Sequence, residues 1–223
     1  NTVLSLLLLL ASLFVKVSIT QKNTNSEHQS KKLSLLEKFI EPKALPISFV
    51  ALLIGFAYSG VMSFLTFYAR EIDLVEASSY FFLAYAFIII FSRPYTGKLM
   101  DLRGPNIIVY PCIIIFAVGM LLFSQASASW MLLVAAALIG LGYGNFNSIA
   151  QTIAVKVTEP HRFGLATSTY FILYDLGLGI GPFILGMVEP HTTYRVIFAS
   201  MIPLILICIP LYYFLVGRKT KTL

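Results

Sequence analysis

Long apolar runs separated by short polar stretches dominate this sequence. After an apolar start at residues 3–15 and a polar, basic stretch at residues 16–46, six further apolar runs follow. A helix needs about 20 apolar residues to cross the hydrocarbon core of a membrane. The pattern predicts six transmembrane helices, at residues 47–69, 77–97, 107–123, 130–155, 163–188 and 196–216. These runs lack the alternating polarity of a membrane β-barrel, and lipid cannot satisfy exposed backbone groups, so helices are expected throughout.

The first apolar run, at residues 3–15, is too short to cross a membrane alone and is not preceded by the cations of a signal peptide. We interpret it as the end of a transmembrane helix, and the chain as the second part of a longer protein. Residues 21–30 are rich in Asn, Ser, Gln and Thr and are predicted to be disordered. Residues 33–40 have apolar positions at helical spacing and predict a short amphipathic helix on the membrane surface.

Composition and charge support this picture. Hydrophobic residues make up 58% of the 223 residues and charged residues only 12%, whereas soluble domains carry about 25% charged residues. A soluble enzyme is therefore excluded. All but two of the 16 lysines and arginines fall on one side of the predicted topology, the exceptions being Arg70 and Arg195. The excess of cations predicts that residues 16–46 and the tail at 217–223 are cytoplasmic.

The most polar interruption between two spans is the stretch at residues 92–106, SRPYTGKLMDLRGPN. We predict a tight cytoplasmic hairpin in which Gly97 and Gly104 permit sharp turns and Asp101 pairs with nearby cations. Arg93 is interpreted as a helix-end cation that snorkels or pairs with Asp101, not as a substrate ligand. On charge alone, the stretch could serve only to set topology. The residues assigned to a candidate gating loop are Arg93, Gly97, Asp101, Arg103 and Gly104.

The spacing of Gly97, Leu99, Asp101 and Gly104 resembles the loop signature of the major facilitator superfamily, G-x-L-a-D-r-x-G-r-k. The arginine after the acid is displaced to Arg103, and Pro105 and Asn106 replace the two final basic residues, so the stretch resembles the weaker copy of the signature between helices 8 and 9. The resemblance implies an all-α integral membrane protein, the six-helix C-terminal half of a twelve-helix major facilitator fold preceded by the end of helix 6.

On this resemblance the chain divides into four parts. Residues 1–15 are expected to be the end of transmembrane helix 6 and residues 16–46 the cytoplasmic central loop. Residues 47–216 would form the C-terminal six-helix bundle, and residues 217–223 the cytoplasmic tail. The expected partners are the lipid bilayer, a small-molecule substrate and the N-terminal six-helix half of the same protein, with the substrate site at the midplane between the halves.

Asp175 is the acid that lies clearly inside a predicted span. Counted from residue 163 it falls roughly 18 Å along the helix, near the middle of a hydrocarbon core of about 30 Å. An ionisable group at this depth usually faces a cavity or a partner. One interpretation is a carboxylate that accepts and releases a proton during transport. The other is a packing carboxylate that is hydrogen-bonded to a neighbouring helix, to Tyr174 or to a backbone group.

The same helix carries the sequence GLGIGPFILG. Gly177 and Gly181 lie four residues apart on one face and allow two helix backbones to approach closely, and Pro182 is expected to bend the helix. The stretch resembles the G-x-x-x-G-P-x-x-G-G signature of helix 5 in drug/proton antiporters, except at Leu185. Ordinary glycine-mediated packing is the alternative explanation of this glycine pattern. Both explanations predict a close contact between two helices.

Two faces are candidates for contacting a substrate. In the fourth span Asn147, Ser148 and Gln151, together with Thr152, share a narrow polar face. In the first span Tyr58, Ser59 and Ser63 form a mixed polar and aromatic face, which suits amphipathic or cationic compounds. The resembled family lines its cavity with the corresponding helices 7 and 10. Hydrogen bonding between helices, packing or lipid contact is the alternative reading of both faces.

The favoured function is a secondary active transporter in the plasma membrane that exports small molecules by alternating access, driven by a proton gradient. Proton-coupled uptake of a metabolite and a non-transporting scaffold or receptor remain alternatives, while an intramembrane enzyme would need paired catalytic groups. No cofactor, metal or nucleic acid is expected: the histidines lie far apart in loops, Cys112 and Cys208 lie in apolar runs, and no stretch interleaves basic and aromatic residues.

Overall fold

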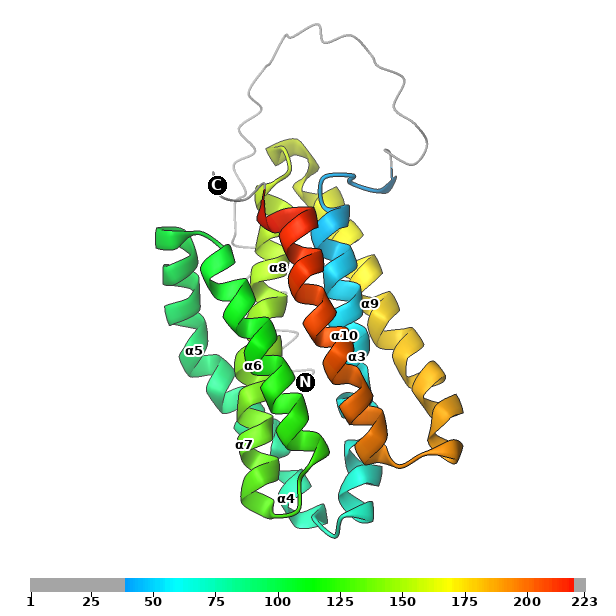
Figure 1. Ribbon diagram of the computed structural model, residues 1–223. Coiled ribbons are helices and arrows are strands. Elements are labelled where there is room, and N and C mark those ends of the chain that lie inside the picture. Colours follow the sequence, from blue (N-terminus) through cyan, green and yellow to red (C-terminus); the bar gives the residue numbers. More distant parts are fainter. Residues whose placement is uncertain (1–38, 219–223) are drawn as a thin grey trace, which may run out of the picture. The chain divides into compact units, whose positions relative to one another are not determined.

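The computed structural model describes residues 39–218, and its described part is a bundle of helices without strands (Figure 1). Three expectations lie outside or almost outside the described residues: the helix end at residues 1–15, the disordered stretch at residues 21–30, and all but the last two residues of the surface helix at residues 33–40. The expected tail at residues 217–223 is described only at its first two positions.

The helices follow one another with short connections. The first four are α3 (Leu45–Glu71), α4 (Val75–Ser79), α5 (Phe81–Arg103) and α6 (Asn106–Ser124). The fourth span consists of α7 (Ser129–Ile139), a π-helical segment η1 (Gly140–Gly144) and α8 (Asn145–Lys156). The last two spans are α9 (Phe163–Val188), preceded by η2 (Pro160–Arg162) and followed by η3 (Glu189–His191), and α10 (Tyr194–Tyr212), which continues into η4 (Tyr213–Gly217).

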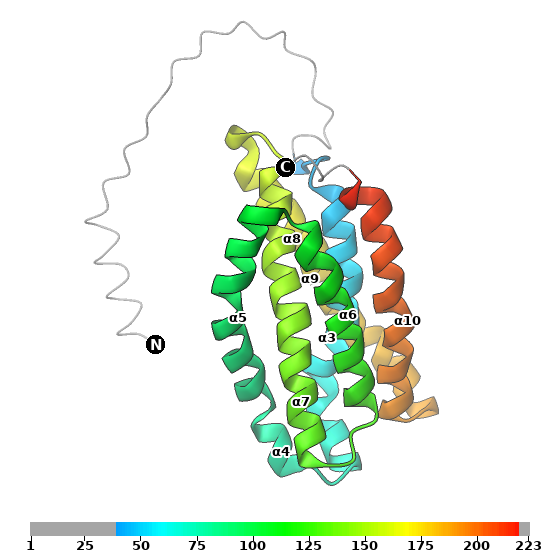
Figure 2. The same ribbon diagram turned by 60° about the vertical axis from the view of Figure 1, so that its left-hand side comes forward.

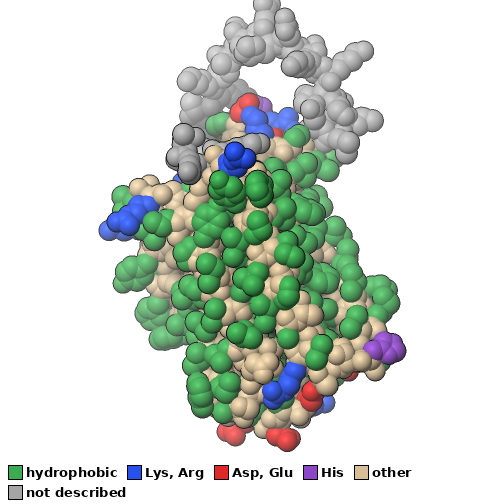
Figure 3. Space-filling model, viewed as in Figure 1, with side chains coloured by type: hydrophobic (Ala, Val, Ile, Leu, Met, Phe, Trp, Pro, Cys, Tyr) green, Lys and Arg blue, Asp and Glu red, His purple; other side chains and the backbone are tan. Residues whose placement is uncertain are grey.

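Among the described residues, 6 helices are long and apolar enough to cross a membrane. They coincide with the six predicted spans, and the predicted all-α membrane fold is confirmed. Charged side chains lie at the two ends, and an apolar belt lies between them (Figure 3). We call the end that holds Lys43, Lys156 and Arg162 the basic end, and the end that holds Glu71, Asp73 and Glu189 the acidic end.

The core of the bundle is built around α3 and α6. Helix α3 packs most extensively against α9 and also contacts α10, while α6 packs against α7 and α10. Helices α5 and α9 lie at opposite edges of the bundle in Figure 1, whereas α5 and α10 lie at opposite edges in the turned view of Figure 2. On α5 only Phe81 and Met100 are buried. Both edge helices therefore present broad apolar faces, as a lipid environment or further membrane helices would require.

The polar stretch at residues 92–106 is mostly helical, so the predicted hairpin is wrong in part. Helix α5 runs to Arg103, and only Gly104 and Pro105 separate it from α6. Gly104 has a φ of 82°, a left-handed conformation that glycine adopts without strain. Gly97, expected to turn, lies inside α5, where an added Cβ would meet nothing within 4 Å. The helix therefore continues beyond the apolar run and into the polar stretch.

Two further expectations for this stretch are corrected. Asp101 does not pair with Arg93, Lys98 or Arg103; its Oδ1 lies 3.1 Å from Nζ of Lys156 at the end of α8. Arg93 is not at a helix end, because α5 continues for about ten residues beyond it, or roughly 15 Å. The ion pair therefore joins α5 to α8, and Arg93 lies inside the span.

Candidate functional site

Five tyrosines gather in the interior of the bundle. This tyrosine cluster comes from α3, α5, η1 and α9 and consists of Tyr58, Tyr85, Tyr143, Tyr170 and Tyr174. The ring of Tyr58 stacks on Tyr143 with centroids 3.8 Å apart and planes inclined by 16°. Its other neighbour is Tyr85, at 5.9 Å. Stacked rings from three helices give the centre of the bundle a rigid aromatic wall.

The tyrosine hydroxyls are joined through Asn147 of α8. The hydroxyls of Tyr143 and Tyr174 are hydrogen-bonded to each other. Asn147 Nδ2 donates to the Tyr174 hydroxyl at 3.3 Å, while the Tyr170 hydroxyl donates to Asn147 Oδ1 at 2.5 Å and lies 3.1 Å from its backbone carbonyl. One amide thus orients two tyrosines of α9, and the network links η1, α8 and α9 inside the membrane.

The π-helical segment η1 brings Tyr143 into this network. Its glycines lie against the backbones or side chains of two neighbouring helices: a Cβ on Gly140 would lie 2.8 Å from the carbonyl oxygen of Tyr85, and one on Gly142 would lie 2.6 Å from that of Cys112. Gly144 packs against Ile89. Because only glycine allows these approaches, η1 is held between α5 and α6, and Tyr143 projects toward α3. Single π turns within α-helices are frequent at functional sites.

A second polar group, between α8 and α5, surrounds Asn145. This side chain is fully buried; its Nδ2 donates to Ser92 Oγ and to the Leu141 carbonyl, both at 2.8 Å. Its Oδ1 accepts from Thr96 Oγ1 at 3.0 Å. The sequence analysis singled out Asn147 on this span, yet it is Asn145 that fixes α8 to α5.

Replacing Asn145 with leucine should destabilise the protein by about 1–2 kcal/mol, because an interhelical hydrogen bond in a membrane contributes roughly 0.6 and at most about 1.7 kcal/mol. Thermal unfolding of the detergent-solubilised parent protein measures this. Thr152→Val is the matched control, since the Thr152 hydroxyl donates only to the Ser148 carbonyl of its own helix. Equal melting temperatures for wild type and Asn145→Leu would contradict the assigned role.

The residues predicted to contact a substrate divide into two groups. Tyr58 belongs to the tyrosine cluster, and Asn147 forms the hydrogen bonds that join its hydroxyls. Ser148 and Gln151 lie half-buried on the Asn147 side of α8. Ser59 instead faces α9, and its hydroxyl donates to the carbonyl of Phe56 on its own helix, α3, at 2.7 Å. Ser63 is exposed on the outside of α3. The sequence analysis missed four tyrosines of the cluster, although each lies deep within a span rather than at its ends, where membrane tyrosines usually gather.

Asp175 lies on the outer face of α9. It is exposed, and it forms no hydrogen bond or ion pair with any other described residue. The proposed packing bond to Tyr174 is absent, because the Tyr174 hydroxyl is engaged by Tyr143 and Asn147. The carboxylate therefore points away from the core of this bundle, toward whatever covers the outer face of α9.

The glycine face of α9 lies against α3. Gly177 contacts the carbonyl of Leu52, and Gly181 contacts the side chain of Ser59, with the Phe56 carbonyl oxygen 3.2 Å from the position of an added Cβ. Pro182 lies within α9, which continues as one helix to Val188. The two glycines let the α3 and α9 backbones come close together at the depth of the tyrosine cluster.

At the basic end, the segment before α3 is attached to the start of α9. Glu41 is buried, forms an ion pair with Arg162, and its backbone N–H donates to Thr169 Oγ1 at 2.8 Å. Beside it, the Nζ of Lys43 lies 3.2 Å from Oε1 of Glu159. The hydrogen bond and charge of Lys43 lower the pKa of the exposed Glu159 carboxyl, so this carboxyl is ionised at neutral pH. We call the residues of the two ion pairs, Glu41, Lys43, Glu159 and Arg162, the basic-end anchor.

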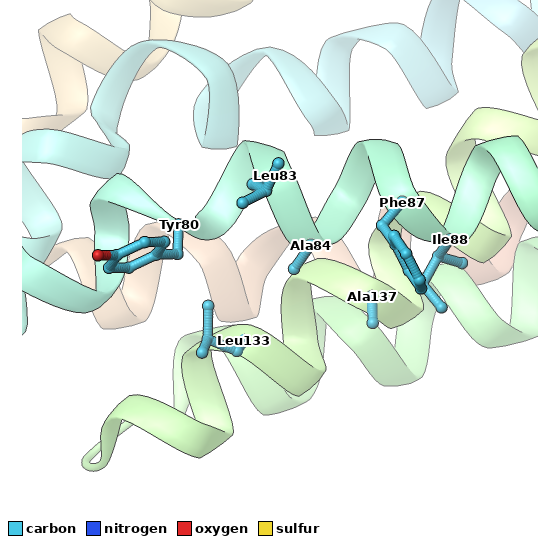
Figure 4. Close-up of a pocket in the computed structure, with 7 residues that line it drawn as sticks. All are labelled: Tyr80, Leu83, Ala84, Phe87, Ile88, Leu133 and Ala137. Atoms are coloured by element: carbon cyan, nitrogen blue, oxygen red, sulfur yellow. The ribbon is translucent and has the colours of Figure 1, made fainter.

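An apolar groove of about 440 Å³ lies between α5 and α7, on the outside of the bundle (Figure 4). Its lining is hydrophobic, and the Tyr80 side chain alone carries a polar atom. The lining residues are Tyr80, Leu83, Ala84, Phe87, Ile88, Leu133 and Ala137. The groove offers apolar contact alone, whereas the tyrosine cluster combines aromatic faces with hydrogen-bonding groups.

In the part of the chain that the structure describes, six helices of membrane-spanning length around a polar, aromatic centre define a multi-pass membrane protein. The chain matches the sequence model of the Major Facilitator Superfamily over residues 1–124 and 77–223, and it belongs to that superfamily. The family expected from the loop at Gly97 and Asp101 is therefore confirmed.

Among its curated relatives, the chain is 29% identical over 173 residues to the multidrug resistance protein MdtG of Salmonella typhi. The aligned stretch covers 75% of the chain and 43% of that relative. The MdtG proteins of Salmonella paratyphi B and Salmonella newport are each 28% identical over the same length. The chain thus spans less than half the length of the curated relatives it matches.

Proposed function

We propose that the bundle is one half of a secondary transporter that moves small amphipathic compounds out of the cell. The observation that carries this proposal is the tyrosine cluster: aromatic faces and hydrogen-bonding groups from α3, α5, η1, α8 and α9 meet inside the membrane. The names of the MdtG relatives support export of several compounds. Superfamily membership supports a carrier rather than an enzyme.

In this mechanism the Tyr58–Tyr143 stack provides a flat surface for the apolar or aromatic part of a substrate, and aromatic faces also attract cations. Asn147, Ser148 and Gln151 provide hydrogen bonds from the adjoining face of α8. The hydroxyl network connects this surface to α9. A substrate that displaced one partner of the Tyr143–Tyr174 pair would change how η1 and α9 are held together, which is the differential contact that alternating access requires.

The topology assigned to the chain is part of the proposal. The basic end is cytoplasmic, as the distribution of lysine and arginine supports, and so is the tail at residues 217–223. Residues 1–15 end the sixth helix of the whole transporter, and residues 16–46 form its central loop. The bundle then works against an N-terminal half of six helices, with the gating loop around Gly97 and Asp101 at the cytoplasmic side.

Proton coupling is assigned to Asp175. A carboxylate on the outer face of α9, inside a membrane span and without a partner among the described residues, is costly unless it meets water, a proton or another part of the protein. In the coupled cycle it takes up a proton in one orientation of the transporter and releases it in the other. Proton-coupled uptake of a metabolite would use the same groups in the reverse direction. A scaffold would need none of them.

The full-length parent protein in inside-out vesicles with an imposed pH gradient tests the proposal. We expect gradient-driven accumulation of members of a panel of amphipathic dyes and small metabolites. Asp175→Asn should abolish gradient-driven accumulation while exchange of substrate down its own gradient persists. Tyr143→Ala should lower accumulation by roughly two- to tenfold through loss of the stacked surface, since aromatic pairs contribute about 0.5–1.5 kcal/mol beyond their burial.

Tyr213→Ala is the matched control, because this half-exposed tyrosine of η4 lies at the basic end, outside the cluster. The folded amount of each variant is measured by size-exclusion chromatography. Accumulation that persists in Asp175→Asn would assign coupling to another group. Absence of flux for the whole panel, with folded protein present, would contradict transport and favour the scaffold.

A further inference from the structure

Arg93 is a cation within a membrane span. It lies roughly 15 Å before the last residue of α5, within a helix that is long and apolar enough to cross a membrane. Helix α5 runs from the acidic end to the basic end (Figure 1). Side chains on a helix lean toward its N-terminus. The guanidinium is therefore directed along the outside of α5 toward the middle of the span, away from the nearer basic end.

No described residue neutralises this charge. Arg93 is exposed, and its side chain forms no ion pair or hydrogen bond with another described residue. Its neighbours on the outside of α5 are apolar or aromatic, namely Ile90, Phe91 and Tyr95. Asp175, the described carboxylate at comparable depth, is on α9 at the opposite edge of the bundle. An arginine at this depth is stable only when it meets water or an anion.

Arg93 follows Tyr85 of the tyrosine cluster on α5 by eight residues, or roughly 12 Å along the helix. Its neighbour Ser92 accepts a hydrogen bond from the buried Asn145, and Thr96 donates one to the same side chain. These bonds hold this turn of α5 against α8. Arg93 is also within electrostatic range of Tyr85, the member of the cluster contributed by α5. The exposed cation thus lies near Tyr85, which is the partly buried member of the cluster.

We infer that Arg93 binds the acidic group of transported solutes, a carboxylate or a phosphate, while their apolar part lies against the tyrosine cluster. This assignment rests on the proposed transport function and defines its substrate class as amphipathic organic anions. The guanidinium suits such groups because its planar fork of N–H donors binds two oxygens at once, which a lysine ammonium cannot reproduce. Arg93 is then a specificity-determining residue that the interpretation as a helix-end cation had excluded.

The test compares an aromatic carboxylate with its neutral amide of the same size, using the full-length parent protein. Gradient-driven transport is measured in vesicles and binding is measured by calorimetry in detergent. Arg93→Gln should lower transport and binding of the carboxylate at least tenfold and those of the amide less than twofold. Arg93→Lys should give an intermediate loss. The control is Arg70→Gln, which removes an exposed arginine from the last turn of α3, at the acidic end, and should not alter the preference for the acid.

Each result decides one point. Equal losses for acid and amide would show that Arg93 pairs with an acidic side chain elsewhere in the protein or is structural, and would overturn the inference. Unchanged carboxylate transport would also overturn it. A parent protein that carries the amide but not the acid refutes the substrate class and leaves transport intact. Arg93-dependent binding of the carboxylate without any flux contradicts transport alone.

Discussion

Gly177→Ala should destabilise the protein by about 3 kcal/mol or more, the upper range for overpacking a membrane or protein core. The added methyl would overlap the carbonyl oxygen of Leu52 and lie 3.0 Å from its carbonyl carbon. Backbone atoms cannot rotate away as a side chain can, so α3 and α9 would have to separate. The expected result is a large loss of folded protein in size-exclusion profiles and a melting temperature lowered by several degrees in detergent.

Gly179→Ala is the matched control on the same helix. An added Cβ there would meet nothing within 4 Å, and alanine favours a helix over glycine by roughly 0.5–1 kcal/mol. This variant should be as stable as the wild type or slightly more stable. If the two alanine variants melted together, the close contact between α3 and α9 would be refuted.

Arg162→Gln should lower stability by about 3 kcal/mol, because removing one partner of a buried ion pair leaves an uncompensated charge. The side chain of Glu41 is only 4% exposed and that of Arg162 is 22% exposed. The substitution would release the segment before α3 from the start of α9. Thermal unfolding of the parent protein measures the loss, and limited proteolysis between α8 and α9 should become faster.

Two comparisons isolate the ion pair. The double variant Glu41→Gln, Arg162→Gln removes both charges and should recover most of the stability. Lys43→Gln removes the exposed pair with Glu159, whose side chains are 55% and 59% exposed, and should cost less than about 1 kcal/mol. A double variant no more stable than Arg162→Gln would show that packing around Arg162, rather than charge, holds the basic-end anchor.

The fold was largely predictable because hydrophobic runs of membrane length leave few alternatives. The span predicted at residues 163–188 coincides with α9, and the others begin and end within a few residues of the observed helices. The exception is α5, which extends to Arg103 beyond its apolar run. Hydropathy shows where the apolar part of a helix ends, but not where the helix itself ends. The polar composition of residues 92–106 therefore suggested a loop.

The candidate site was less predictable, because it depends on which side chains meet across helices. Asn147 stood out as a polar group in an apolar run, but its partners Tyr170 and Tyr174 come from another span, and nothing in the sequence pairs them with Asn147. The pairing of Asp101 with Lys156 similarly joins two residues that are far apart in the sequence. The roles assigned to Asp175, to the substrate contacts and to the gating loop remain predictions for the experiments above.

The π-helical segment η1 has a consequence for how the fourth span can present its side chains. A π turn accommodates one residue more than the α-helical repeat, so it shifts the angular phase between α7 and α8. Leu132, Ala135 and Ile139 of α7 are buried as an apolar stripe, and beyond η1 the polar row that begins at Asn147 starts afresh at a different angle. One membrane span thereby presents two surfaces at independent angles: an apolar surface on α7 that packs against neighbouring helices, and a polar surface on α8.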